Sequence, residues 1–462
     1  MTRRFLDQIH EQSLEILREV GLMIPDKEVL IRLGREGFPI DLGKMTIQFP
    51  PALVEKALKS IQPVFSLRGR TSESILEFKG STKFMTSGTG VGILDGVTNE
   101  RRNSTSQDVE NLVKIQQALE HVDIVRSMVT ATDYPPDFTD IVEFYYMFKY
   151  SIKPFFHRTM HPDNISTVME MAEIVSGDPP GLERKPLFGV VYCPLSPLSF
   201  AGEAIQSILL YAEKKVPVLI LSMAMGGATA PATLVGELIV INAEVLGTAT
   251  LVKSLFQDAP LLYGSVSSVL DMKTGILALG APERGVLNLW CARMAQYYGM
   301  PSVVGGLSTD ARDLDAQAGF EKALTALPLM GEANLIFGMG VIDSANSYSY
   351  EQLILDNEFV GALKKVEKGL NKGDGKEEVE LIKLLGPKKD YLSEMHTVRN
   401  YREYWRSTLF KRGSVEGKNI VTKANERWRK ILNNASCYEP LDDKLDAELI
   451  RLLQKKMGKF PL

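Results

Sequence analysis

One repeated pattern constrains the fold of this chain more than any other feature. From about Lys83 the sequence repeats a short apolar, β-branched run, a polar or glycine-rich turn, and an amphipathic helical stretch. About eight such units occur without a break in composition, which favours a closed (β/α)8 TIM barrel over an open sheet of five or six strands. The predicted strands are Phe84–Leu94, Ile124–Thr132, Pro154–Met160, Leu187–Cys193, Val218–Met225, Leu261–Val266, Ser302–Leu307 and Leu335–Val341.

Helical periodicity fills the intervals between these strands and both flanks of the repeat. We predict an N-terminal helical lead-in with a small hairpin over residues 1–82, the barrel over 83–368, and a charged helical tail over 369–462. The hairpin is expected at Val64–Phe78, and Trp405 and Trp428 are expected to pack the tail onto the barrel. Predicted barrel helices include Asp108–His121, Ile165–Ser176, Ala204–Lys214, Leu234–Leu255, Val286–Tyr297 and Phe320–Leu329.

Composition narrows the class of protein. The hydrophobic share of 45% and charged share of 24% are those of a globular enzyme, and a formal charge of -4 with scattered basic residues argues against nucleic acid binding. The three cysteines fit a reducing cytoplasm. Val216–Val252 is apolar enough to suggest a membrane span, but its prolines, glycines and two glutamates instead predict a buried strand, a turn and a buried helix.

Reactive residues of a parallel barrel lie just after the apolar runs, at the carboxyl ends of the strands. One metal-like cluster passes this filter, His157 and His161 with Cys193, and it supports an alternative reading as a metal-dependent lyase or hydrolase. A hydrogen-bonded histidine at a strand end is the simpler interpretation of His157, so we predict no metal site. The glycines of Gly88–Gly92 lack the pattern of a dinucleotide fingerprint, and a tight turn is the simpler reading.

Several stretches carry a resemblance to a known family. They are IHEQSLEILREVGL (9–22), GVTNERRNSTSQDV (96–109), MGGATAPATLVGEL (225–238), GGLSTDARDLDAQAGFEKAL (305–324), GMGVIDSANSYSYEQLILDNE (338–358) and YLSEMHTVRNYREYW (391–405). In their order and spacing the chain resembles the trimethylamine methyltransferase family. The resemblance implies a barrel that takes a methyl group from a methylated amine and passes it to the cobalt of a separate corrinoid protein.

The resemblance also bears on the substrate. Archaeal trimethylamine enzymes of the family contain pyrrolysine, and this sequence has none. The chain is therefore more similar to the branch without pyrrolysine, which includes glycine betaine methyltransferases. Loss of a methyl group from a quaternary nitrogen releases a neutral tertiary amine, so the leaving group needs no proton. The expected substrate is a small quaternary amine such as glycine betaine, proline betaine or a carnitine-like compound.

The expected pocket residues follow from this substrate. Aromatic faces and soft sulfur groups suit a quaternary cation, and a guanidinium suits a carboxylate. Arg158 or Arg312 could hold the carboxylate, and we favour Arg312 slightly because it lies in a stretch that carries the resemblance. Asp310 and Gln317 either order that loop or contact substrate. The predicted substrate-binding residues are Phe156, Tyr192, Met223, Tyr263, Asp310, Arg312, Gln317 and Tyr348.

Expected partners complete the prediction. Cobalamin should reside on a cognate corrinoid protein, because this chain lacks the DxHxxG pattern by which corrinoid-binding modules supply a histidine to cobalt. No cofactor is expected on this chain itself. The apolar content of the long helices favours a homo-oligomer. A non-catalytic protein that binds betaines remains a further alternative, and it predicts binding without methyl transfer.

Overall fold

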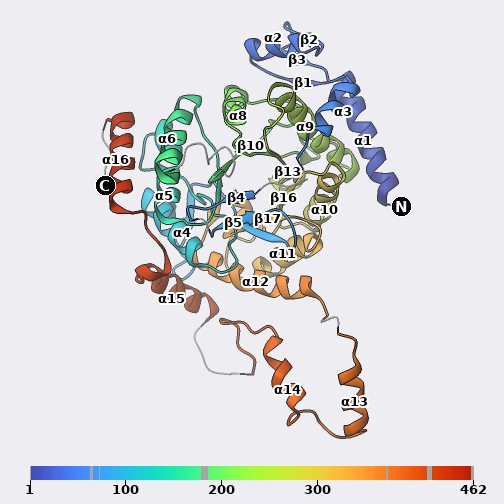
Figure 1. Ribbon diagram of the computed structural model, residues 1–462, viewed down its shortest axis with the longest axis vertical. Coiled ribbons are helices and arrows are strands. Elements are labelled where there is room, and N and C mark those ends of the chain that lie inside the picture. Colours follow the sequence, from blue (N-terminus) through green and yellow to red (C-terminus); the bar gives the residue numbers. More distant parts are fainter. Residues whose placement is uncertain are drawn as a thin grey trace.

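A parallel sheet of seven strands forms the centre of the computed structural model, which describes residues 2–62, 66–71, 73–177, 186–370, 373–413 and 419–458. In space the strands follow the order β6-β17-β16-β13-β11-β10-β9, and the sheet curls with the helices outside it (Figure 1). The predicted α/β class and seven of the eight predicted strands are thus confirmed. The strands are β6 (Lys83–Thr86), β9 (Phe155–His157), β10 (Phe188–Tyr192), β11 (Val218–Ser222), β13 (Leu261–Ser265), β16 (Ser302–Gly305) and β17 (Leu335–Met339).

The two edge strands of this sheet, β6 and β9, are linked by a very short segment, Ile124–Val125. Ile124 forms a single parallel bridge to Met85 of β6, and Val125 forms one to Phe155 of β9. The predicted strand Ile124–Thr132 is therefore too long. Its ladder stops at Val125 because the amide and carbonyl of the next residue, Arg126, are bound by a helix side chain instead.

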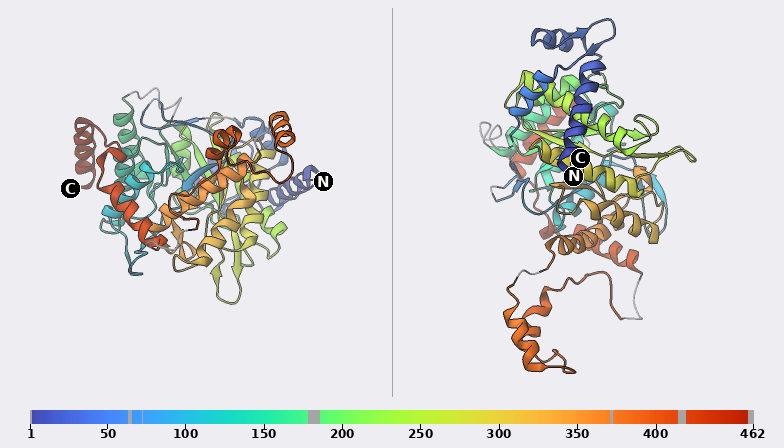
Figure 2. Two further views of the ribbon diagram at one scale, coloured as in Figure 1. Left: turned by 90° about the horizontal axis from the view of Figure 1, so that it is seen from below. Right: turned by 90° about the vertical axis from the view of Figure 1, so that its right-hand side faces the viewer.

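Two other predicted strands are divided, because each run of apolar residues contributes to two different sheets. Phe84–Leu94 splits into β6 and β7 (Gly92–Leu94), which joins a small sheet with β8 (Arg101–Asn103), β18 (Val341–Ile342) and β19 (Ser347–Tyr348). Val218–Met225 splits into β11 and β12 (Met225–Gly226), which pairs with β14 (Ser268–Asp271). With β15 (Ile276–Leu277), β14 forms a hairpin that projects from the body (Figure 2).

Helices cover the outside of the sheet. The predicted helices correspond to α4 (Ser106–Ala118), α6 (Ile165–Ser176), α8 (Ala204–Glu213), α9 (Leu234–Leu255), α10 (Pro282–Tyr297) and α11 (Ala316–Ala326). Two more, α5 (Thr139–Tyr150) and α12 (Tyr350–Lys368), are not singled out by the sequence pattern. Both are buried on most of their sides, so neither shows the polar face that marks an amphipathic helix.

Helix α9 is long and apolar enough to cross a membrane, but 78% of its most apolar window is buried inside the structure. It packs against α1 (Thr2–Glu19), α3 (Pro51–Lys59), α10 and the central strands. The predicted sequence of buried strand, turn and buried helix is therefore found as β11, a turn and α9. A helix that is apolar on every side belongs in a protein core when neighbours surround it in this way.

The N-terminal part adds a small three-stranded sheet to its helices. The strands β1 (Leu22–Met23), β2 (Ile40–Asp41) and β3 (Thr46–Ile47) accompany α1, α2 (Lys27–Arg35) and α3. Next along the chain, β4 (Ser66–Arg68) and β5 (Ile75–Glu77) form an antiparallel pair. Val64, at the start of the segment predicted as a hairpin, lies outside the described residues.

The C-terminal tail has two parts that differ in how they contact the body. Helices α15 (Ile420–Leu432) and α16 (Asp443–Met457) pack on the body, where the Trp428 ring lies 4.8 Å from the Tyr350 ring and its Nε1 donates to Glu351. Helices α13 (Lys376–Leu385) and α14 (Met395–Asn400) instead extend away from it (Figures 1 and 2).

Candidate active site

A cavity of about 780 Å³ opens at the carboxyl ends of the central strands. Because the strands are parallel, the segments that follow β6, β9, β10, β11 and β13 all reach the same end of the sheet and contribute to its walls. The cavity has the size and position of a small-molecule site in a fold of this kind.

Arg126 is the most unusual residue of the cavity wall. Its side chain is almost fully buried, and Nε and Nη1 have no hydrogen-bond partner in the part of the chain that the structure describes. The guanidinium carbon lies 5.7 Å from the centre of the Phe337 ring, which also lines the cavity. Burial lowers the pKa of Arg126 from its ordinary value, and the Arg158 cation lowers it further. A buried cation with free donors requires a compensating anion.

The backbone of Arg126 is fixed by one buried side chain on α4. Gln116 accepts from the Arg126 amide at 3.0 Å and donates to its carbonyl at 2.9 Å. The same Gln116 oxygen accepts from Thr86 Oγ1 at 2.6 Å. Gln116 thus joins the end of β6 to the start of the arginine segment, and it holds the guanidinium in a defined place at the cavity.

Arg158 adds a second cation to the cavity. It follows β9 and, unlike Arg126, its side chain is exposed to solvent. The carboxylate that lines the cavity is Glu203, which is also exposed. The buried end of the cavity therefore carries the positive charge of Arg126, whereas its exposed mouth carries one charge of each sign, from Arg158 and Glu203.

Aromatic and sulfur-containing side chains form much of the remaining wall. Tyr192 at the end of β10 stacks on Phe200, with 5.3 Å between the ring centres. Tyr348 on β19, which belongs to the small sheet with β7, also lines the cavity. Met160 and Met223 line the mouth and are nearly half exposed. Such a wall suits an alkylated ammonium group, which is attracted to the faces of aromatic rings.

Burial holds the titratable groups of the wall in their neutral forms. Burial raises the pKa of the Cys193 thiol, and it raises the pKa of Tyr192 well above its ordinary value. Neither group is therefore ionised near neutral pH, and neither is activated as a nucleophile.

Two residues of the alternative metal site, His161 and Cys193, line the same cavity, but His157 is not among the residues that line it. His157 is fully buried, and its Nε2 lies 2.7 Å from an oxygen of Glu143. Burial raises the pKa of Glu143 to about 8 and lowers that of His157, so both are neutral at pH 7. His161 is half exposed and lies 3.4 Å from Asp137. Within the described ranges no group of three or more His, Cys, Asp or Glu residues is placed to hold a metal ion.

Glycines of the Gly88–Gly92 segment serve the packing of the cavity wall. A side-chain carbon at Gly90 would lie 2.2 Å from the Tyr348 ring, and one at Gly88 would lie 2.2 Å from the Ser127 carbonyl oxygen. Only glycine permits this approach. These glycines therefore seat Tyr348, in an extended segment that pairs with Val129 rather than in a tight turn.

Three of the eight predicted pocket residues, Tyr192, Met223 and Tyr348, line the cavity. Phe156 and Tyr263 lie outside it. The Phe156 ring is packed within the sheet beside Gly189, and the Tyr263 hydroxyl donates to Asn242 on α9. Aromatic residues at strand ends can point to either side of the sheet, and the sequence does not decide which.

The three polar residues that were predicted to bind substrate, Asp310, Arg312 and Gln317, also lie outside the cavity. Asp310 accepts from the amides of Leu279 and Gly280, and it therefore orders a loop. The Arg312 side chain is 72% exposed and lies 3.6 Å from Asp343. Gln317 is exposed and donates to Glu321. Arg126 and Phe337 were not predicted, although a charged residue inside the apolar run DIVRSMV is a signal that marks Arg126.

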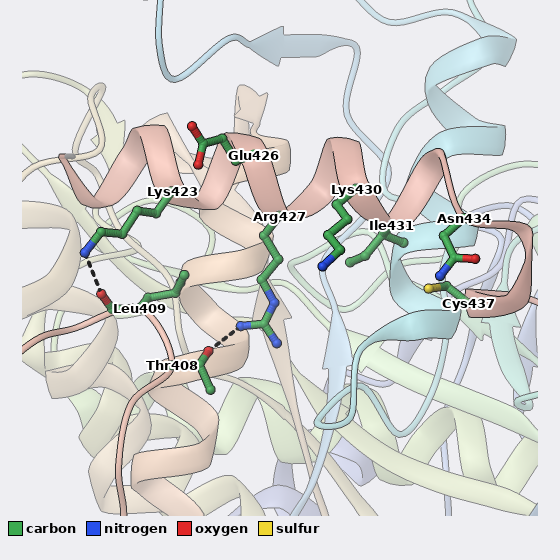
Figure 3. A pocket seen from close by; sticks show the side chains of 9 residues that line it. All are labelled: Thr408, Leu409, Lys423, Glu426, Arg427, Lys430, Ile431, Asn434 and Cys437. Atoms are coloured by element: carbon green, nitrogen blue, oxygen red, sulfur yellow. Dashed lines mark hydrogen bonds between the residues drawn. The ribbon is translucent and has the colours of Figure 1, made fainter. Parts of the chain in front are cut away.

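A second hollow, of about 510 Å³, lies on the tail at α15 (Figure 3). Two of the basic side chains that line it already form hydrogen bonds within the protein. Lys423 donates to the Leu409 carbonyl, and Arg427 donates to Thr408 and to Glu358. The hollow shares no lining residue with the cavity at the strand ends. Figure 3 shows Lys423 and Arg427 of α15 reaching to Leu409 and Thr408 of the preceding segment rather than converging on a common centre.

Comparison with known proteins gives the class of this chain. A model of the trimethylamine methyltransferase family matches residues 1–461. A trimethylamine methyltransferase of Desulfitobacterium hafniense is 34% identical, covering 98% of this chain and 92% of the relative. A glycine betaine methyltransferase of the same species is 31% identical, covering 97% and 95%. The chain belongs to the trimethylamine methyltransferase family, and methyl transfer is its class of activity.

A solved structure is also similar in outline. The monomethylamine methyltransferase of Methanosarcina barkeri aligns with a TM-score of 0.46 and 13% identity, covering 92% of each chain.

Proposed function

We propose that this protein removes a methyl group from a small quaternary amine that carries a carboxylate, and passes it to the cobalt of a cognate corrinoid protein. One observation supports this substrate above others. The buried Arg126 has two free nitrogens at a cavity whose other walls are aromatic and sulfur-containing. A betaine supplies an anion for the guanidinium and a methylated cation for the aromatic wall.

The relatives are consistent with this proposal. One is a glycine betaine methyltransferase and another a trimethylamine methyltransferase, and the chain covers nearly all of both. Trimethylamine has no carboxylate and would leave Arg126 without a partner. The Arg126 cavity therefore favours a betaine over trimethylamine as substrate of this chain.

The proposed fold is a (β/α)8 barrel in which Ile124–Val125 is the eighth strand. Its two parallel bridges, to β6 and to β9, support this reading because they connect the edges of the seven-stranded sheet. The same segment places Arg126 directly after the strand, where barrel enzymes carry their reactive residues.

The proposed reaction requires little acid–base chemistry from the protein. The bond between the methyl carbon and nitrogen breaks, nitrogen keeps the electron pair, and a neutral tertiary amine leaves without a proton. A reduced cobalt centre, held by the partner protein, would supply the nucleophile that accepts the methyl group. Arg126 would orient the substrate through its carboxylate, and the wall of Tyr192 and Tyr348 would surround the ammonium group and exclude water. The neutral Cys193 and Tyr192 suit a site that does not exchange protons.

The test is methyl transfer to Co(I)-cobalamin, followed by its visible spectrum, with and without a cognate corrinoid protein. Glycine betaine, proline betaine, carnitine, γ-butyrobetaine, choline and trimethylamine are compared as methyl donors. We expect methylcobalamin from a carboxylated quaternary amine and much less from choline or trimethylamine. Turnover of choline or trimethylamine as the best donor would contradict the proposal, and tight binding without turnover would favour a betaine-binding protein.

A further inference from the structure

The tail contains a segment that lacks any core of its own. Residues 373–408, which we call the arm, include α13 and α14, and none of these residues is buried. The two helices have 10 and 6 residues. Isolated helices shorter than about 12 residues are marginal in water, and helices in proteins depend on packing of an apolar face.

The contacts within the arm do not provide that packing. Four ion pairs form within its described residues, and every side chain in them except the half-buried His396 is more than half exposed. The pairs are Lys376–Asp374, Lys383–Glu380, Arg399–Glu377 and His396–Glu378. Exposed ion pairs of this kind contribute little to stability. The arm is therefore not stabilised by its own side chains.

Large apolar side chains of the arm face solvent. On α13, Val379, Ile382 and Leu384 are exposed, while Leu381 and Leu385 are half-buried on other sides of the same helix. A helix with apolar residues on several sides needs more than one neighbour. The exposed large apolar residues of the arm are Val379, Ile382, Leu384, Tyr391, Leu392, Met395, Val398 and Tyr404.

The position of the arm indicates which partner covers it. Helix α12 begins at Tyr350, beside the cavity, and the arm leaves from its far end at Lys368, roughly 27 Å away along the helix. The arm returns near the middle of α12, where Ser407 and Thr408 donate to Glu358. In the right-hand view of Figure 2, the arm and the β14–β15 hairpin leave the body in different directions. Because this hairpin follows β13 at the end of the sheet where the cavity opens, the arm projects in a different direction from the cavity mouth.

We propose that a second copy of this chain packs on the arm. Eight side chains of this size and exposure offer roughly 500 Å² of apolar surface, at roughly 100 Å² for each side chain in full. In a symmetric dimer the arm of each copy packs against the other copy. The two arms and the two surfaces that cover them then bury roughly 2,000 Å² in total. That is the area of a stable interface. A single arm on an unrelated partner would bury about half as much.

The experiment compares the oligomeric state of the full chain with that of three variants, by light scattering and sedimentation over a wide range of concentration. Leu392→Asp and Met395→Asp change arm residues that are 82% and 67% exposed. Met272→Asp is the matched control, because Met272 is 76% exposed on the β14–β15 turn. We expect an oligomer in the wild type and in the control, and a dissociation constant roughly tenfold or more higher in both arm variants.

A second measurement uses the wild type alone. Hydrogen exchange of the arm amides should slow as the concentration rises, because association protects them. A monomer at every concentration, an oligomer that persists unchanged in both arm variants, or arm amides that exchange at a constant rate would each overturn the proposal. Arm variants that remain oligomeric but fail to transfer methyl to a corrinoid protein would assign the arm to that partner instead.

Discussion

Replacement of Arg126 by methionine tests the proposed substrate most directly. Methionine has a similar length and keeps the contact with Phe337, but it removes the charge and the two free donors. A hydrogen bond between charged groups contributes about 2 kcal/mol, or roughly a 30-fold change in affinity. Two such bonds to one carboxylate give roughly 1,000-fold. We therefore expect Arg126→Met to raise the KM for a betaine by roughly 30- to 1,000-fold.

The assay measures kcat and KM for the best carboxylated donor and for choline, with methylcobalamin formation as the signal. Choline has no carboxylate, so its weaker turnover should change by less than about threefold. Arg312→Ala is the control, because Arg312 is exposed at the rim and lies outside the cavity. It should leave both donors unaffected.

Stability of the substrate-free protein gives an independent readout of the same change. Arg126 is a buried cation without a hydrogen-bonded anion, so Arg126→Met should leave the melting temperature unchanged or raise it. The betaine should raise the melting temperature of the wild type but not of the variant. Equal loss of activity on choline and on the betaine would refute the reasoning, as would a strong effect of Arg312→Ala.

Three further predictions concern a buried ion pair, a glycine that contacts Tyr348 and a buried carboxyl group. Lys322 and Asp356 form a fully buried ion pair at 2.9 Å. Lys322→Met should therefore lower the free energy of unfolding, measured by urea titration, by about 3–5 kcal/mol. An unchanged free energy of unfolding would show that the pair does not determine stability. Gly90→Ala should displace the Tyr348 ring and lower kcat/KM roughly tenfold, which methyl-transfer kinetics would detect or disprove. Glu143 has a pKa raised to about 8 by burial, so the folded protein holds a proton that the unfolded chain releases. Its contribution to stability is complete below the unfolded-state pKa and is lost as the pH rises to about 8, with a slope of about 1.4 kcal/mol per pH unit. Glu143→Gln should flatten this decline in thermal denaturation between about pH 5 and pH 8, and equal slopes in both proteins would contradict the assignment.

The pattern of strands and helices is predictable from the sequence because alternating buried segments leave a strong periodic signal. Helices α6 and α9 agree with their predicted bounds at both ends. Strand continuity is less predictable, since apolar residues continue beyond the ladder into other sheets. Thus Phe84–Leu94 is two strands, and Ile124–Thr132 contributes Ile124 and Val125 to the central sheet and Val129 to an isolated bridge with Gly90.

The site residues are harder to predict, for a physical reason that differs between residue types. Tyr192 and Tyr263 both follow the rule for strand ends, and their shared register with Ile220 puts them on the same side of the sheet. Tyr192 nevertheless lines the cavity, whereas the Tyr263 hydroxyl is bound to Asn242 on α9. Arg312 lies in a stretch that carries the family resemblance, but the loop turns it to solvent. Arg126 was overlooked because the strand before it ends at Val125, seven residues before the predicted end at Thr132.

The brevity of the Ile124–Val125 segment has a consequence for how specificity can diverge among relatives. This segment contributes one bridge on each side, whereas β11 and β13 share five aligned residue pairs. A change of sequence or length here costs few ladder hydrogen bonds, while the rest of the sheet keeps its register. The segment before the proposed anion-binding arginine is therefore held by fewer ladder contacts than β11 or β13, and Gln116 supplies part of its anchorage instead. We expect substrate specificity to diverge through the side chain at position 126, with the Gln116 contacts retained.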